Sequence, residues 1–130
     1  MAGLIYLDAS ACVKLVLSEP ESHAVQAAIE DVERLVASEV LEVEVMRATR
    51  RGGGEITVAR AQLDGVRLLP LSDEIRRRAS ELLPLSIRSL DAIHIASALE
   101  LGERLDGLFT YDQRMATAAR ETGLEVRAPA

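Results

Sequence analysis

The stretch "LIYLDASACVKLV", residues 4–16, decides the fold and raises the main question about this chain. Its apolar residues 4–7 predict a short buried strand. The strand ends on Asp8, whose side chain is among those least suited to burial. Two small residues follow, and a second apolar segment then predicts a helix. A carboxylate at the end of a buried strand needs a structural or a functional reason.

Strand-like and helix-like segments alternate along the rest of the chain. The glycines of "RGGG", residues 51–54, predict a helix stop and turn rather than a phosphate loop, because they follow a helix and no GK[ST] is present. Gly123 suits the C-cap of the last helix. Alternation of this kind predicts an α/β fold with a mostly parallel sheet covered on both faces. The further strands are expected at 34–37, 67–70, 107–110 and 124–127, and the helices at 10–17, 20–32, 39–51, 55–64, 72–82, 89–101 and 112–122.

Composition limits the class of protein. The 130 residues suit one domain, residues 1–130, whose core is built from aliphatic side chains because aromatic residues make up only 2% of the chain. The lone Cys12 excludes an intrachain disulfide and is expected to fill the core. No segment has the character of a membrane span or a signal peptide, so we expect a cytoplasmic protein. The net charge of −6 argues against binding nucleic acid by bulk charge.

Two acids follow predicted strands. Asp8 ends the first strand, and Asp112 comes just after "GLFT", residues 107–110. Ligand sites in parallel sheets lie beyond the carboxyl ends of strands, so the two acids are expected to share one crevice. The alternative for each is a helix N-cap, a position that Asp favours.

A third acid lies on the apolar side of a predicted helix. Helical periodicity over residues 39–48 places Glu44 among apolar side chains and places Glu39 and Glu42 on the solvated side. A buried carboxylate without a partner costs several kcal/mol, so Glu44 needs a partner or a metal ion. A partner arginine is the structural alternative.

A fourth acid begins the apolar helix "SLDAIHIASAL", residues 89–99. Asp91 has apolar neighbours on its own face, and its place in the first turn is favoured by the helix dipole only to a small extent. His94 follows one turn later and is expected to be a hydrogen-bonded core residue, whereas His23 lies in a polar helix and is expected to be exposed. Four crowded carboxylates repel one another, and a divalent cation relieves that repulsion. An all-oxygen donor set favours Mg²⁺ or Mn²⁺ over Zn²⁺.

The segments that carry these acids resemble PIN-domain ribonucleases, and more narrowly the VapC toxins of type II bacterial toxin–antitoxin systems. The resemblance covers nearly the whole chain, and all four segments occur in the family's order and at family-like spacing. The matching segments are "YLDASACVKL" at 6–15, "SEVLEVEVMRA" at 38–48, "RSLDAIHIASAL" at 88–99 and "FTYDQRMATAARETGL" at 109–124.

The resemblance implies a three-layer α/β/α sandwich with a short, mostly parallel central sheet. It also implies RNA cleavage that depends on Mg²⁺, for which Mn²⁺ can substitute, inhibition by a small VapB-like antitoxin, and a homodimer that joins a larger toxin–antitoxin assembly. By motif position, the catalytic and metal-binding acids are Asp8, Glu44, Asp91 and Asp112. The family's accessory hydroxyl groups fall on Ser10 and Thr110.

The chemistry expected of such a site is metal-assisted hydrolysis of a phosphodiester. A phosphorelay receiver domain has a similar acid cluster but needs a lysine after its last strand, and the only lysine here is Lys14. A haloacid-dehalogenase-type phosphatase needs a second Asp where this chain has Ser10. A catalytically silent PIN-like module that only binds a partner remains an alternative. Arg47, Arg50, Arg51, Arg88 and Arg114 could form a local basic rim that contacts phosphates, and the alternative, favoured for most of them individually, is a solvated place on a helix surface.

Overall fold

Strand β1 (Ala2–Leu7) runs through the middle of a five-stranded sheet in the computed structural model, which describes residues 2–130. The strand order is β3-β2-β1-β4-β5, and every neighbouring pair is parallel. The mostly parallel sheet expected from the sequence is therefore confirmed. The other strands are β2 (Val32–Ser38), β3 (Val66–Leu69), β4 (Gly107–Phe109) and β5 (Val126–Arg127).

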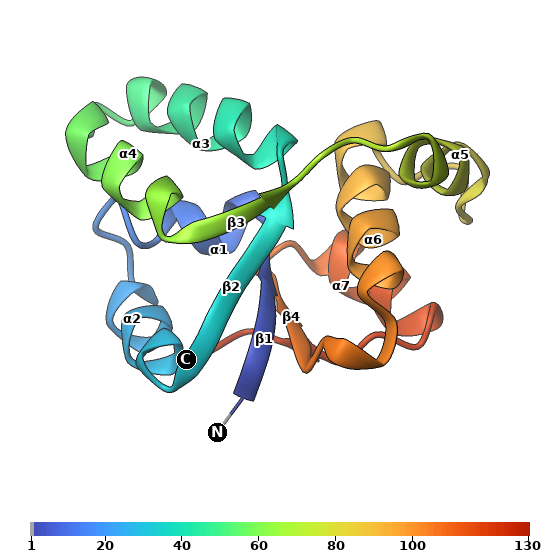
Figure 1. Cartoon of the computed structure of the whole chain (residues 1–130). Coiled ribbons are helices and arrows are strands. Elements are labelled where there is room, and N and C mark those ends of the chain that lie inside the picture. Colours follow the sequence, from blue (N-terminus) through green and yellow to red (C-terminus); the bar gives the residue numbers. More distant parts are fainter. Residues whose placement is uncertain (1) are drawn as a thin grey trace.

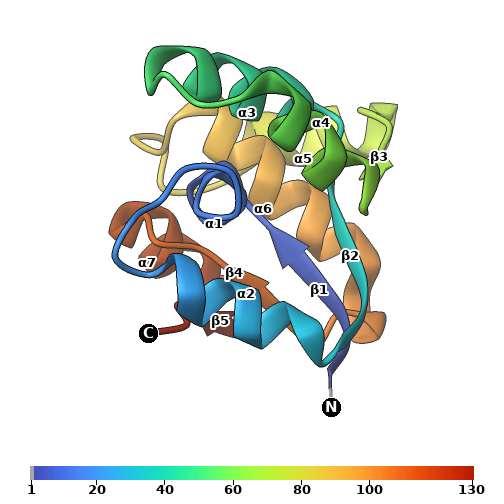
Figure 2. The same cartoon turned by 90° about the vertical axis from the view of Figure 1, so that its left-hand side faces the viewer.

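Helices cover both faces of the sheet and complete three layers. Figures 1 and 2 show α1 to α4 on one side and α5 to α7 on the other, as right-handed crossovers require for this strand order. None of the helices within residues 2–130 is long and apolar enough to cross a membrane. The helices are α1 (Ala9–Val13), α2 (Ser22–Glu30), α3 (Val40–Arg51), α4 (Ile56–Asp64), α5 (Asp73–Glu81), α6 (Ser89–Leu101), the 3₁₀ turn η1 (Gly102–Arg104) and α7 (Gln113–Glu121).

Several helix ends differ from the sequence-based expectation, and α2 for example is shorter than the expected 20–32 at both ends. Helix α1 stops at Val13, and residues 14–17 form turns instead of the expected further helical turn. Helix α7 ends with Thr122 as its C-cap, so Gly123 lies one residue later than expected. Gly123 has a φ of +94°, a conformation in which a side chain would be strained, and this reverses the chain toward β5.

The core lies on both faces of the sheet, against α1, α3 and α4 on one side and α6 and α7 on the other. Ile5, Tyr6 and Leu7 of β1 are completely buried, and α6 is buried almost all round, as its apolar sequence predicts. Cys12 is also completely buried, which raises the pKa of its thiol to about 12. Its expected place in the core is therefore confirmed. One consequence is that β1 is held rigidly up to its last residue, next to Asp8.

Candidate active site

Strand order creates a crevice beside Asp8. The chain leaves β1 toward the face covered by α1 and leaves the neighbouring strand β4 toward the face covered by α7. Adjacent parallel strands whose connections diverge in this way open a crevice at their carboxyl ends. Leu7 pairs with Phe109 at this point, so the residues after both strands lie side by side.

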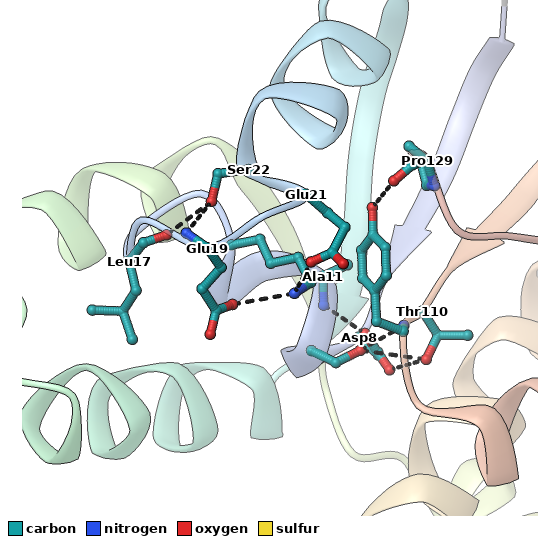
Figure 3. A network of polar contacts seen from close by, with 11 residues as sticks. Asp8, Ala11, Leu17, Glu19, Glu21, Ser22, Thr110 and Pro129 are labelled. Carbon is teal, nitrogen blue, oxygen red and sulfur yellow. Dashed lines mark hydrogen bonds and ion pairs between the residues drawn. The ribbon is translucent and has the colours of Figure 1, made fainter.

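Asp8 is buried at this point and is fully engaged in hydrogen bonds. It is only 3% exposed and is the N-cap of α1. Its Oδ1 accepts from the backbone N–H of Ala11 at 2.9 Å and from the hydroxyl of Ser10 at 2.7 Å, and its Oδ2 accepts from the hydroxyl of Thr110 (Figure 3). Burial raises the pKa of the Asp8 carboxyl, and the hydrogen bonds oppose that effect only in part.

Ser10 and Thr110 connect the two strand ends. The Ser10 hydroxyl oxygen accepts from the backbone N–H of Tyr111 at 2.8 Å, and that of Thr110 accepts from the N–H of Asp112 at 3.1 Å. The two hydroxyl oxygens are 3.4 Å apart. Both side chains therefore orient Asp8 and fix the loop after β4, a local role that their sequence positions alone did not reveal.

Asp112 is the matching N-cap on the other side of the crevice. Its Oδ1 accepts from the backbone N–H of Arg114 at 2.9 Å and of Met115 at 3.1 Å, at the start of α7. The capping alternative is therefore correct for Asp8 and for Asp112. Capping does not remove them from the crevice, because each side chain is still directed to the carboxyl end of the sheet.

Asp91 joins this group from the first turn of α6. The structure describes no hydrogen bond to its carboxylate within residues 2–130, and the side chain is half-buried. Burial raises the pKa of Asp91, and the negative charges of Asp112, Asp8 and Glu44 raise it further. The structure therefore brings the four predicted acids close enough for Asp91 to be repelled by the other three.

Glu44 lies at the edge of the buried face of α3 rather than in its middle. Its side chain is 17% exposed, and its Oε1 is 2.6 Å from Nε2 of His94. The alternative of a partner arginine is not found, because the partner that the structure describes for Glu44 within residues 2–130 is His94. Glu42 lies on the solvated side as predicted and pairs with Arg60.

His94 is the residue that sequence reasoning undervalued. It is 1% exposed, as expected for a hydrogen-bonded core residue, but its partner is an acid of the crevice. Its other ring nitrogen, Nδ1, is 2.7 Å from the hydroxyl of Tyr6. The available signal was helical spacing, since His94 lies one turn after Asp91 and therefore near the same edge of α6.

The side chains that could bind a metal ion here, those of the four acids, offer only carboxylate oxygen atoms. No three His, Cys, Asp or Glu side chains within residues 2–130 close around one point as a finished metal cage would. Burial and then the negative charges of Asp112, Asp8 and Glu44 nevertheless raise the pKa of Asp91, so the four acids are near enough to interact electrostatically. Oxygen donors without thiolates fit a hard cation such as Mg²⁺ or Mn²⁺.

Two hollows flank the acids, and each contains basic side chains. One, of about 350 Å³, is lined by Glu44 together with Arg47 and Arg51. The other, of about 620 Å³, is lined by Asp112 and Thr110. The second hollow also contains Lys14 and Arg120, and Lys14 lies 4.7 Å above the ring of Tyr111 and pairs with Glu19 and Glu21.

Comparison with known proteins agrees with this geometry. The family model described as "PIN domain" matches residues 5–121. Ribonuclease VapC46 of Mycobacterium tuberculosis (strain ATCC 25618 / H37Rv) is 42% identical over 126 residues, which cover 96% of this chain and 97% of that relative. The same arrangement of elements occurs in solved structures of low sequence identity, so these show the fold alone.

Two of these structures come from toxins. The structure of M. tuberculosis VapC20, a toxin that cleaves the sarcin–ricin loop, matches with a TM-score of 0.74 at 17% identity over 88% of this chain and 94% of that chain. A toxin–antitoxin complex from Klebsiella pneumoniae matches with a TM-score of 0.64 at 20% identity over 85% of this chain and 88% of that chain. The crevice, the family match and the full-length relative lead to one conclusion: the chain belongs to the PIN-domain family and, within it, to the VapC ribonucleases.

Proposed function

We propose that this chain is a metal-dependent endoribonuclease that acts as the toxin of a toxin–antitoxin pair in the cytoplasm. The observation that supports the proposal is that Asp8 and Asp112 follow the paired strands β1 and β4, where their charges, with that of Glu44, act on Asp91. RNA as the substrate is supported by the full-length relative that is named a ribonuclease.

The four acids would hold the cation. Mg²⁺ is commonly bound by one or two carboxylates, with water and substrate phosphate oxygens completing its shell, so a closed protein cage is not required. Bound there, Mg²⁺ or Mn²⁺ supplies a Lewis acid that activates water and offsets charge on the scissile phosphate. Asp91 contributes a carboxylate that no described hydrogen bond occupies, whereas Asp8 contributes one held in a single orientation.

Water, rather than the 2′-hydroxyl of the RNA, is the proposed nucleophile. Water adds a hydroxyl group to phosphorus, the bond from phosphorus to the 3′ oxygen breaks, and the leaving oxygen takes a proton. The products then carry 5′-phosphate and 3′-hydroxyl ends. The carboxylates of the crevice are suited to accept the proton that the attacking water loses.

Basic side chains beside the crevice offer an answer to the unfavourable net charge of −6. Arg47 and Arg51 line the hollow next to Glu44, and Arg120 lines the hollow next to Asp112. We propose that these side chains contact backbone phosphates on both sides of the cleaved bond, which would position the RNA independently of its sequence.

Nuclease assays test the activity. Purified protein is expected to cleave RNA in Mg²⁺ or Mn²⁺ and to stop in excess chelator, and sequencing of the products should find 5′-phosphate ends. Asp91→Asn is expected to be inactive, and Glu42→Gln serves as the matched control. Cleavage that survives chelation, or 2′,3′-cyclic phosphate ends, would contradict the mechanism. A wild-type protein that binds a partner but neither Mn²⁺ nor RNA would instead favour the silent binding module.

The proposed partner is a small VapB-like antitoxin that acts on a homodimer of this chain within a larger assembly. A solved toxin–antitoxin complex of the same fold supports this expectation. A guanidinium or ammonium group from the partner would pair with the crevice acids and occupy the space that the cation and phosphate need. Mixing this chain with the product of the neighbouring gene should give a complex on gel filtration and suppress cleavage in excess Mg²⁺. An absent complex with undiminished cleavage would remove the partner proposal and leave the nuclease proposal in place.

A further inference from the structure

A buried chain of hydrogen bonds connects the core of the sheet to the crevice. The backbone N–H of Ser38, at the end of β2, donates to the Tyr6 hydroxyl at 2.8 Å. The same hydroxyl is 2.7 Å from Nδ1 of His94, and Nε2 of His94 is 2.6 Å from Oε1 of Glu44. The side chains of Tyr6 and His94 are completely or almost completely enclosed. Four elements, β2, β1, α6 and α3, therefore meet through one continuous network.

The partners assign the tautomer of the histidine. The Tyr6 oxygen accepts from Ser38, and the phenol has one proton of its own to donate. Nδ1 of His94, 2.7 Å away, is the partner to which we assign that proton. The ring proton is then on Nε2, from which it donates to the carboxylate of Glu44. In this arrangement every donor of the network has an acceptor, as a buried polar network requires.

We propose that His94 is a positioning residue, which holds the carboxylate of Glu44 in the crevice through Nε2–H while Tyr6 fixes the ring tautomer through Nδ1. This inference rests on the proposed function of Glu44 as an acid of the metal site. In this proposal His94 and Tyr6 do not touch the ion. They orient the carboxylate that binds it, as residues around metal ligands commonly do.

The need for such a residue follows from the length of the glutamate side chain. Asp8 is oriented by two hydroxyl groups and an N–H group, and Asp112 by two N–H groups at a helix start. Glu44 lies in the middle of a helix, where the backbone N–H groups are already bonded, and it has one more rotatable bond than Asp. Its bond to His94 is therefore the fixed contact that the structure describes for it.

Two substitutions of similar size separate positioning from simple core filling. In His94→Gln the amide N–H₂ can reach the place of Nε2 and donate to Glu44, whereas in His94→Asn the shorter amide reaches only the place of Nδ1 and Tyr6. The experiment measures Mn²⁺ binding by calorimetry in the full chain and thermal unfolding in parallel. We expect His94→Asn to weaken Mn²⁺ binding by about 10- to 100-fold and His94→Gln to regain most of that loss. Equal Mn²⁺ affinity in the two variants would overturn the inference.

A double-mutant cycle provides a readout that a purely structural role would not change. In a Glu44→Gln background, His94→Asn is expected to cause no further loss of Mn²⁺ affinity, because the carboxylate that it positions is already absent. A full additional loss would show that His94 acts by another route. If the variants do not fold, ¹⁵N NMR of the wild-type ring still decides, since a proton on Nδ1 instead of Nε2 would overturn the assignment.

The same measurements distinguish this inference from the function on which it rests. A wild-type protein that binds no Mn²⁺ would remove both. Wild-type binding that Asp8→Asn abolishes, together with unchanged binding in His94→Asn, would remove only the positioning role. Loss in His94→Asn, recovery in His94→Gln and loss in Asp8→Asn are the combined result that we expect.

Discussion

The four acids of the crevice form two pairs that are built differently. Asp8 and Asp112 follow strands β1 and β4, and each caps the helix that comes next. Glu44 and Asp91 lie within helices α3 and α6 and cap nothing. The strand-end pair thus has a capping role that any α/β protein would use, whereas Glu44 is bonded to His94 and no described hydrogen bond reaches the carboxylate of Asp91.

This difference predicts at which acids a substitution changes activity without changing stability. Removal of a strand-end acid also removes hydrogen bonds to the first turn of a helix, so stability and activity change together. Removal of Asp91 takes away a carboxylate that its neighbours repel, so only activity should suffer. The helix pair is therefore the more specific indication of function, and the predictions below test that separation.

The largest expected effect is loss of cleavage in Asp8→Asn and in Asp91→Asn. Each change removes a negative charge from the proposed cation site, and we expect a loss of about a thousandfold in single-turnover rate. Both variants should fold, since Asn at position 8 can still accept from Ala11 and donate to Thr110. Near-wild-type cleavage by either purified variant would contradict the role of that acid.

A smaller loss is expected for Glu44→Gln, of about 10- to 100-fold in the same assay, because the amide keeps the contact with His94 but weakens the hold on the cation. Glu42→Gln is the matched control on the same helix. It disturbs only a surface pair with Arg60, which is about half exposed, and should cleave like the wild type. Equal behaviour of the two variants would show that the orientation of α3 does not matter for cleavage.

Stability separates the pairs directly. Asp8→Ala and Asp112→Ala each remove an N-cap and should lower the free energy of unfolding by about 1 kcal/mol, measured by urea denaturation. Asp8→Ala should cost more than Asp112→Ala, because it also leaves the hydroxyls of Ser10 and Thr110 without their acceptor. Asp91→Ala should lower it by less than either. A comparable loss from Asp91→Ala would erase the distinction between the pairs.

The smallest effect concerns pH in metal-free protein. The raised pKa of Asp91 means that the folded chain holds its proton where the unfolded chain has lost it. The free energy of unfolding that Asp91 contributes therefore falls as the pH rises from about 4, the ordinary pKa of Asp, through the raised pKa of the folded protein. Asp91→Asn removes this contribution, so the variant should gain stability over wild type across that window and keep the gain at higher pH. A gain that shrinks with rising pH would mean that the carboxylate is stabilised in the fold.

Local sequence predicted most of the elements because their signals are local. The apolar run before Asp8, the periodicity of residues 89–101 and the glycines after Arg51 each depend on a few neighbouring residues. The pairing of Glu44 with His94 could not be predicted in this way, because it joins residues 50 positions apart on two helices. The helical periodicity predicted which side of α3 carries Glu44 and which side of α6 carries His94. It gave no information on whether these two sides pack against each other.

The glycines of the turn after α3 show the same limit. The sequence predicts a helix stop there, and Gly52 is the C-cap of α3. The structure adds a tertiary reason, since a Cβ at Gly52 would lie 2.7 Å from Cδ1 of Leu17. Leu17 belongs to the turns that replaced the expected end of the first helix. The tertiary contact therefore adds to the local reason for glycine at this position, and it could not be predicted from either segment alone.

The pairing of β1 with β4 has a consequence for the newly made chain. Ile5 pairs with Gly107 and Asp8 meets Thr110, so the crevice joins residues about 100 positions apart. Contacts between residues so far apart in the sequence form late in folding, because closing the long loop between them costs chain entropy before the contacts stabilise the fold. A growing chain still lacking β4 has only one side of the crevice. Chains that end before residue 107 would therefore lack β4 and Thr110 and could not form a complete crevice.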